Sequence, residues 1–347
     1  MTGDSQAGVA GQDAAPVMQL CATIESMMAA QVIGTAARLG LADQLAQGPK
    51  SAGETVRAIG ADPGLGRRFL LACVSVGLLT ETEPGLFALT PAGECLRSDG
   101  QSLRDLAIAT TSPGFWLPMG RLCDVVRTGL PAAEPALGMT IWDYYRANPE
   151  EGAHFTTAMR QNTAESPAEL TRHYDFSRFS RIVDVGGGRG DLLAAILAAA
   201  PAASGVLFDR PEAIKEAAEV MAAHGLAGRA EVAGGDFLDE VPPGGDLYVM
   251  RIVLCDWDDA HAVQILRNCL RAGRPGVHVL IAEMLMSGAE AGSSRHLQDL
   301  IEFAVTGGRV RTVTDLEKLT AEAGYHGGHV VAAMDAMTLF EAWARCP

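Results

Sequence analysis

Residues 181–191 read RIVDVGGGRGD, and their types and spacing are suited to binding a ligand. The apolar run 182–185 predicts a buried strand, and residues 192–200 predict a helix directly after it. Glycines at 186, 188 and 190 let backbone N–H groups approach a ligand at a helix N-terminus. A dinucleotide loop has the spacing G-x-G-x-x-G, which would need glycine where this chain has Asp191. The run therefore indicates a different ligand loop, or a tight strand–helix turn that binds nothing.

Acidic and aromatic residues follow the next predicted strands. Asp209 comes after strand 205–208, where a carboxylate can accept hydrogen bonds from ribose hydroxyls. Asp236 and Phe237, behind Gly235 and strand 230–233, are placed to meet an adenine amino group and to cover its ring. Beyond strand 246–249, Arg251 can hold a carboxylate and Trp257 can stack on adenine. Each residue alone is a weak signal, but together they indicate a nucleoside-containing ligand.

The elements that must position these residues alternate between strand and helix. Further strands are predicted at 277–282 and 328–334, and a final helix at 336–344. This order predicts a doubly wound α/β domain over residues 181–347, in which ligands bind at the carboxyl ends of the strands.

The N-terminal part predicts a second domain. Residues 1–17 are small and polar, which indicates a disordered tail and neither a signal peptide nor a transit peptide. Residues 18–110 read as long helix, short capped helix, helix and hairpin, the order of a winged helix. Its third helix carries only Arg67 and Arg68 as basic residues, so we expect no nucleic-acid binding. The apolar first helix is expected to pack against a second copy of the chain.

Residues 111–180 are predicted to be a helical linker rich in large side chains. Two interpretations stand: a helical core, or the wall of an apolar pocket for a flat substrate. The side chains that would line such a pocket are Phe115, Trp116, Phe155, Met159 and Asn162.

Composition excludes several functional classes. With 347 residues the chain has room for two domains, and its net charge of −15 disfavours nucleic acid or an anionic membrane as a partner. We find no apolar stretch long enough to span a bilayer. Seven scattered cysteines without a C-x-x-C pair indicate reduced thiols and a cytoplasmic protein, and no histidine spacing indicates a metal site.

The chain resembles a known family in several short motifs. The first is Asp184-x-Gly186-x-Gly188-x-Gly190, and the others are YDFS at 174–177, LFDRP at 207–211, GDF at 235–237, VLCDWDD at 253–259, AE at 282–283 and TGGRVRT at 306–312. Together they resemble the S-adenosylmethionine-dependent small-molecule O-methyltransferases of the plant caffeic-acid type and of bacterial antibiotic pathways.

The resemblance implies a fold and a function. The fold is a Rossmann-like methyltransferase domain with an N-terminal winged-helix domain that forms a homodimer. The function is methylation of a small hydroxylated aromatic compound in secondary metabolism. The residues implied for S-adenosylmethionine are Asp184, Gly186, Gly188, Gly190, Asp209, Arg210, Gly235, Asp236, Phe237, Arg251 and Trp257. Those implied for catalysis are Cys255, Asp256 and Glu283.

The chain departs from the family where the acceptor would lose its proton. The family has a histidine base where this chain has Cys255, and a supporting glutamate where it has Val310, whereas Glu283 is retained. An unperturbed thiol, with a pKa of about 8.5, is a poor base at neutral pH. Three alternatives remain open: O-methylation by proximity, C-methylation of an activated ring carbon, or a relative that reuses the fold without methyl transfer.

A further departure is Glu302, which follows Asp299 at positions that would face the acceptor and replaces an apolar residue of the family. A buried acid needs a cationic partner, and the ammonium group of an aromatic amino acid would provide one. Arg295, His296 or Arg309 could provide one within the chain. Two other functional classes are disfavoured: a winged-helix regulator, for lack of a basic helix, and a dinucleotide oxidoreductase, because of Asp191.

Overall fold

The computed structural model describes residues 14–100, 102–161, 167–286, 294–334 and 337–345. The chain divides into two compact units, residues 1–116 with 149–162 and residues 117–148 with 163–347. The predicted linker, residues 111–180, is therefore shared between the units.

The first unit follows the predicted order of helix, helix, helix and hairpin. The Ser51 hydroxyl accepts the Glu54 N–H and the Glu54 carboxylate accepts the Ser51 N–H, so the expected capping box is present. Its elements are α1 (Ala14–Arg38), α2 (Leu41–Leu45), β1 (Lys50–Ser51), α3 (Ala52–Ala58), α4 (Pro63–Ser75), β2 (Leu79–Glu83), β3 (Leu86–Leu89), α5 (Pro91–Glu94), α6 (Arg104–Thr111) and α11 (Pro149–Gln161), and α7 (Pro113–Met119) crosses the boundary. The three strands pair antiparallel in the order β1-β3-β2.

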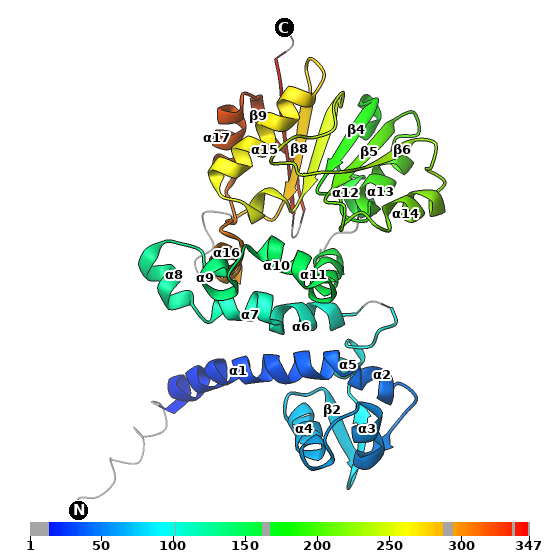
Figure 1. The fold of residues 1–347 in the computed structure, drawn as a ribbon, viewed down its shortest axis with the longest axis vertical. Coiled ribbons are helices and arrows are strands. Elements are labelled where there is room, and N and C mark those ends of the chain that lie inside the picture. The colour runs from blue at the N-terminus through cyan, green and yellow to red at the C-terminus, as the bar shows by residue number, and fades with distance from the viewer. Residues whose placement is uncertain (1–13, 101, 162–166, 287–293, 335–336, 346–347) are drawn as a thin grey trace, which may run out of the picture. The chain divides into compact units, whose positions relative to one another are not determined.

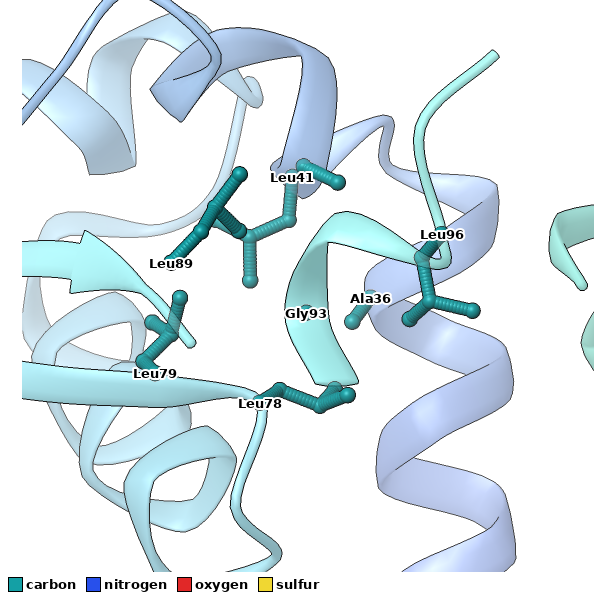
Figure 2. Close-up of a pocket in the computed structure, with 8 residues that line it drawn as sticks. Ala36, Leu41, Leu78, Leu79, Leu89, Gly93 and Leu96 are labelled. Carbon is teal, nitrogen blue, oxygen red and sulfur yellow. The ribbon is translucent and has the colours of Figure 1, made fainter. Parts of the chain in front are cut away.

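The core of this unit is apolar and nearly closed. Leu70, Cys73 and Phe87 are fully buried among residues of α1, α2 and the hairpin. Figure 2 shows a gap in this core, lined by Ala36, Leu41, Ala42, Leu78, Leu79, Leu89, Gly93 and Leu96, with a volume of about 10 Å³. Such a gap holds at most about one water-sized sphere, so it is a packing defect and not a ligand site.

Helix α1 corrects two expectations. It begins at Ala14, so residues 14–17 are helical and do not belong to a disordered tail. Its segment Ala15–Arg38 is, among the described residues, the one helix long and apolar enough to cross a membrane by length and composition, which the sequence analysis had overlooked. Large apolar side chains on this helix are exposed, namely Val17, Met18, Leu20, Ile24, Met27 and Met28.

The second unit is built on a seven-stranded sheet of order β6-β5-β4-β7-β8-β10-β9 (Figure 1). Its strands are β4 (Arg181–Val185), β5 (Ser204–Asp209), β6 (Ala230–Gly234), β7 (Leu247–Arg251), β8 (His278–Glu283), β9 (His326–Ala333) and β10 (Thr338–Trp343). Its helices are α8 (Leu122–Thr128), α9 (Ala133–Leu137), α10 (Ile141–Ala147), α12 (Pro167–Leu170), η1 (Phe176–Arg178), α13 (Asp191–Ala199), α14 (Ala217–Ala223), η2 (Leu254–Asp256), α15 (Asp259–Ala272), α16 (Ser294–Thr306) and α17 (Val313–Ala323). Strands β6, β5, β4, β7 and β8 are parallel, as expected for a doubly wound domain.

The order of the strands in the sheet indicates where a ligand would bind. The chain runs outward from β4 through β5 to β6, then returns to the other side of β4 with β7. The point where the order reverses is where open α/β sheets bind ligands, at the carboxyl ends of the strands. The segments after β4 and β7 therefore meet at this switch point.

Successive residues of a strand point to opposite faces of the sheet, so the strands contribute to two apolar cores, one on each face. Val183, Tyr248 and Ile281 pack with α15 and α17 on one face of the sheet, and Ile182 and Val249 pack with α13 on the other. A sheet covered on both faces has nearly continuous apolar strands, which is why the sequence revealed them.

The predicted C-terminal helix is wrong, because residues 338–343 form strand β10. β10 pairs antiparallel with both β8 and β9, and its residues Leu339, Phe340 and Ala342 are fully buried. A short apolar run fits either element by periodicity, and pairing on both sides decides for the strand. Residues 337 and 344 of the predicted helix lie outside the strand, and residue 336 lies outside the described residues.

Candidate active site

The glycine run forms a tight loop from β4 into α13. Gly186, Gly188 and Gly190 all have positive φ, at 73°, 56° and 91°. A Cβ at Gly190 would lie 2.4 Å from Met221 Cε, whereas one at Gly188 would meet no atom within 4 Å. Position 188 therefore requires glycine because of its positive φ and not because a side chain would clash with a neighbour. The loop is open at that position.

Asp184, at the end of β4, is an acid held out of water. Its side chain is 1% exposed, and its Oδ2 has no hydrogen-bond partner among the described residues. Burial, followed by the neighbouring charge of Asp209, raises the pKa of Asp184 to about 7, against the opposing effects of Arg251 and the Leu193 N–H. An unfilled acceptor of this kind marks a place where a donor or a cation is missing.

Asp209 joins the second strand to the glycine loop. Its Oδ2 accepts the Gly188 N–H at 2.9 Å, and its Oδ1 accepts the Arg210 N–H at 2.7 Å. Burial is the main reason that the pKa of this carboxyl is raised. The structure thus places Asp209 at the switch point, where its Oδ2 also holds the glycine loop.

The segment after β6 lies beside the same site. The Gly235 N–H donates to the Asp209 carbonyl at 3.1 Å. Asp236 is exposed, and its Oδ1 accepts the Leu238 N–H at 2.8 Å, so it caps its own turn. The ring of Phe237 meets that of Trp257 edge to face, with centroids 5.7 Å apart.

A strained residue turns the chain after β7. Ile252 has φ 53°, and it is the one non-glycine residue with positive φ in the described ranges. Such a conformation costs roughly 1–3 kcal/mol and is concentrated at functional sites. Its N–H donates to the Ala282 carbonyl at 2.9 Å. The turn leaves Arg251 at the strand end and leads into η2, which carries Cys255 and Asp256.

Helix α10 contributes an aromatic group that the sequence analysis had placed only in the linker. Trp142 stacks on Trp257 with centroids 6.2 Å apart and an interplanar angle of 22°. The guanidinium of Arg210 lies 5.4 Å from the centre of the Trp142 ring. Trp142 thus connects two candidate cofactor positions, one beside Asp209 and one after β7.

Four groups that can exchange protons lie around η2. The Cys255 N–H donates to Glu283 Oε1 at 3.0 Å, and Glu283 Oε2 has no partner among the described residues. The carboxyl groups of Asp256 and Glu302 are hydrogen-bonded to each other. The Thr306 hydroxyl donates to Glu302 Oε1 at 3.3 Å.

These groups shift one another's protonation. Burial, and then the charges of Glu283, Asp256 and Glu302, raise the pKa of Cys255 well above its usual value. Burial is also the first cause of the raised pKa of Asp256, Glu283 and Glu302. The Cys255 thiol is therefore neutral near neutral pH, which weighs against it as a base.

Two further side chains, Asp299 and Arg311, hold the loop before α17 and the segment around η2. Asp299 Oδ1 accepts the Val310 N–H at 2.8 Å, so this predicted acceptor contact anchors the loop before α17. Arg311 is fully buried and donates to the carbonyls of Leu254 and Trp257 and to Asp259. Arg311 lies in one of the family motifs, but its sequence position predicts no role, because nothing in a sequence shows that an arginine is buried.

The predicted acceptor-wall residues lie in the first unit. Phe115 and Trp116 are on α7, and Phe155 and Met159 are on α11. Gly114 beside them donates its N–H to Glu151 Oε1 at 2.8 Å, which ties the two helices together. Met159 is 37% exposed. Asn162 lies outside the described residues.

Two family models match the chain. The O-methyltransferase domain matches residues 119–326, and the O-methyltransferase dimerisation domain matches residues 21–99. The chain belongs to the O-methyltransferase family. The predicted Rossmann-like domain with an N-terminal dimerisation domain is thereby confirmed.

Relatives of this chain are named as methylating oxygen or nitrogen. Phenazine O-methyltransferase PhzM of Lysobacter antibioticus is 35% identical over 90% of this chain and 92% of its own. The 8-amino-8-demethylriboflavin N,N-dimethyltransferase of Streptomyces davaonensis is 35% identical over 85% of this chain and 86% of its own. A solved structure of similar fold is that of NcsB1, an O-methyltransferase from neocarzinostatin biosynthesis, in complex with S-adenosylmethionine and 2-hydroxy-5-methyl naphthoic acid. It is 33% identical in sequence with a TM-score of 0.79, and the match covers 91% of this chain and 95% of that chain.

The protein is an S-adenosylmethionine-dependent methyltransferase, and its own residues fit that cofactor. The buried, unfilled oxygen of Asp184 suits a cation or an N–H donor, and the cofactor carries both an ammonium group and a sulfonium. The open position at Gly188 leaves the loop backbone accessible. When bound, the cofactor supplies an electrophilic methyl group.

Proposed function

We propose that this methyltransferase transfers the methyl group of S-adenosylmethionine to a small hydroxylated aromatic acceptor in secondary metabolism. The observation that carries the proposal is the set of buried acids around η2, which lies one strand away from the unfilled oxygen of Asp184. The names of relatives support an aromatic acceptor, because phenazine, riboflavin and naphthoic acid are all flat ring systems.

For the cofactor, we assign the residues of the switch point. Asp184, the glycine loop, Asp209 and Arg210 would hold the amino-acid and ribose parts, and Arg251 would bind the carboxylate. Gly235, Asp236, Phe237 and Trp257 would surround the adenine. To these we add Trp142, whose ring lies between Arg210 and Trp257.

For the acceptor, we assign Phe115, Trp116, Phe155, Met159 and Asn162 as contacts, with Glu283 and the Asp256–Glu302 carboxyl pair at the transfer point. Methylation of the phenolic oxygen and methylation of an adjacent ring carbon both stand. In the first, orientation does most of the work, since the thiol of Cys255 is a poor base. In the second, the hydroxyl activates the ring and is not itself the nucleophile.

An alternative role for Glu302, exclusive of a role in proton transfer, is to bind an ammonium group of the acceptor, such as that of an aromatic amino acid. The side-chain hydrogen-bond partners of Glu302 are Asp256 and Thr306, and Arg309 pairs instead with Asp259 and Asp315. The Glu302→Gln variant should then bind tyrosine more weakly than the wild type, measured by calorimetry with S-adenosylhomocysteine present. Equal affinity in both proteins would exclude this recognition.

We also propose that the enzyme acts as a homodimer in the cytoplasm. The dimerisation-domain match and the exposed apolar face of α1 support pairing of two chains. The cysteines among the described residues are free, which suits a reducing compartment.

The test is a mass-shift assay with trideuteriomethyl S-adenosylmethionine and five acceptors. The compounds are tyrosine, 3,4-dihydroxyphenylalanine, 4-methylphenol, 3,4-dihydroxybenzoic acid and 1,4-dihydroxy-2-naphthoic acid. We expect a labelled product from at least one, and NMR of that product distinguishes oxygen from carbon. Tight binding of S-adenosylhomocysteine without any product would favour the alternative of a relative that reuses the fold for another purpose.

A further inference from the structure

The carboxyl groups of Asp256 and Glu302 must share a proton. Two ionised carboxylates have no hydrogen to donate and repel each other, so a hydrogen bond between them requires one to be protonated. Burial raises the pKa of both carboxyls, which favours a protonated form of the pair, and the carboxyl that holds the proton donates to the other. The pair therefore carries a single negative charge and has room for a second proton.

Among the described residues, the groups that act on the pair are carboxyls and a hydroxyl. The groups that face it are Asp256 and Cys255 on η2, Glu283 on β8, and Asp299 and Thr306 with Glu302 on α16. Arg311 acts on Cys255 and Glu283, while its N–H groups are directed to Leu254, Trp257 and Asp259. Arg295 on the same helix donates to the Leu285 carbonyl, and His296 is exposed.

A second observation indicates that a ligand group belongs here. Glu283 is 1% exposed, its Oε2 has no partner among the described residues, and its charge acts on both Cys255 and Asp256. A buried oxygen without a donor is costly, so the arrangement is complete only when a donor from outside the chain arrives. An acceptor hydroxyl is such a donor.

We propose that the hydrogen-bonded pair of Asp256 and Glu302 takes the acceptor's proton during methyl transfer, at the place where the family has a histidine in position 255. This inference rests on the proposed function. Glu283 is less suited to the task, because the N–H groups of Val253, Leu254 and Cys255 and the charge of Arg311 favour its ionised form. A base is most effective when its pKa lies near the working pH, and burial moves the pair in that direction.

The step balances. The acceptor oxygen forms its bond to the methyl carbon, the S–CH₃ bond breaks, and that electron pair stays on sulfur as a neutral thioether. The hydroxyl proton moves to the ionised carboxylate of the pair, which then holds two protons and later releases one to water. Methylation of a ring carbon also releases one proton in total, so the same pair serves both routes.

The first test needs no acceptor. In the complex with S-adenosylhomocysteine, the infrared C=O stretch of a protonated carboxyl should be present at pH 6 and disappear as the pH rises. Asp184, whose pKa is about 7, adds a band of its own, so the pair is measured as the difference between wild type and variant. We expect the band to be weaker in Glu302→Gln and in Asp256→Asn, and unchanged in Glu317→Gln, which changes an exposed glutamate on α17. No such band in the wild type, or a band unchanged in both pair variants, would overturn the shared proton.

The second test follows the rate against pH, with whichever of the five compounds the wild type methylates fastest. The pair must be ionised to accept a proton, so kcat/KM should rise with pH through a pKa above the usual carboxyl value of about 4. Glu302→Gln replaces one carboxyl of the pair with an amide that does not titrate, so the pH at which kcat/KM rises should change and kcat should fall at least roughly tenfold. Affinity for S-adenosylhomocysteine should not change in this variant.

An unmoved pH profile with an unchanged kcat in Glu302→Gln would contradict the inference. The two failures are distinguishable: a wild type that methylates none of the five compounds counts against the proposed function, whereas the infrared result judges the pair without any acceptor.

Discussion

Asp184 is a buried acid whose ionisation lowers the stability of the folded chain. Its folded-state pKa of about 7 lies above the value of 3.8 expected for an exposed aspartate. A carboxyl whose pKa is raised in the folded state binds its proton more tightly there than in the unfolded state. The free energy of unfolding therefore falls as pH rises from about 4 to about 7 and stays low above that. The cost without ligand is at most about 4 kcal/mol.

The Asp184→Asn variant should therefore be more stable than the wild type and should bind S-adenosylhomocysteine more weakly. Without cofactor at about pH 8, we expect unfolding to require about 1–3 kcal/mol more than in the wild type, measured by urea denaturation. Calorimetry should show S-adenosylhomocysteine binding at least about tenfold weaker. The wild-type affinity should increase as Asp184 ionises from about pH 6 to about pH 8, and that of the variant should not. A variant with unchanged affinity would remove Asp184 from the cofactor site.

Cys255 should react slowly despite its place in the site. Its pKa is raised well above the usual value, and burial raises that of Cys73 to about 12, so little thiolate is available in either. The exposed residues Cys21, Cys95 and Cys123 should be alkylated first by iodoacetamide at about pH 8. Peptide mass spectrometry measures the order, and urea-unfolded protein serves as the control. Rapid modification of Cys255 would restore it as a candidate base.

The sequence predicted which residues belong to the candidate site better than it predicted the contacts and burial of their side chains. Asp184, Asp209, Glu283 and Glu302 stand at predictable positions, because each follows a strand or lies in a recognisable motif. That Glu302 pairs with Asp256, and that Arg311 is buried beneath η2, could not be predicted. Both facts depend on contacts between β8, α16 and the loop before α17, which are distant in the chain.

Helix α10 is the element whose importance the sequence did not reveal. It is anchored to the segment after β5 by Arg146, which contacts Glu212 at 3.2 Å, and by the Trp142 ring under Arg210. An aromatic pair contributes about 0.5–1.5 kcal/mol beyond its burial.

Replacing Trp142 tests this role. Trp142→Leu should weaken S-adenosylhomocysteine binding by roughly 3- to 10-fold in calorimetry, because one aromatic wall is lost. The matched variant Trp343→Leu removes a tryptophan of β10 and should leave the affinity unchanged. If both variants bind alike, Trp142 does not contact the cofactor.

Most strands were predicted within a residue or two, because the sheet is covered on both faces and its strands read as apolar runs. The strand β10 was missed for the same reason, since an apolar run of six residues does not distinguish helix from strand. Its position between β8 and β9 decides its conformation, and no local pattern reports that position.

At the scale of the whole molecule, α1 links folding to assembly. Its exposed apolar side chains recur at helical spacing through Leu20, Ile24, Met27 and Met28. An apolar face of this kind is typical of an interface between chains. The dimerisation-domain match covers the same helix.

Charges placed on that face should separate the chains. The double variant Ile24→Glu with Met28→Glu should shift the protein from dimer to monomer in size-exclusion chromatography with light scattering, because the carboxylates would be buried unpaired. Gln19→Glu on the same helix is the control, since Gln19 is exposed and polar. A dimer that persists in the double variant would place the interface elsewhere.

The most direct measurement for the whole account is product stoichiometry. The wild-type enzyme is incubated with labelled S-adenosylmethionine and the acceptor panel, and S-adenosylhomocysteine and methylated product are both counted by mass spectrometry. The account predicts one S-adenosylhomocysteine for each methylated aromatic molecule. Cofactor that is bound but never converted, or S-adenosylhomocysteine formed without any methylated aromatic product, would contradict it.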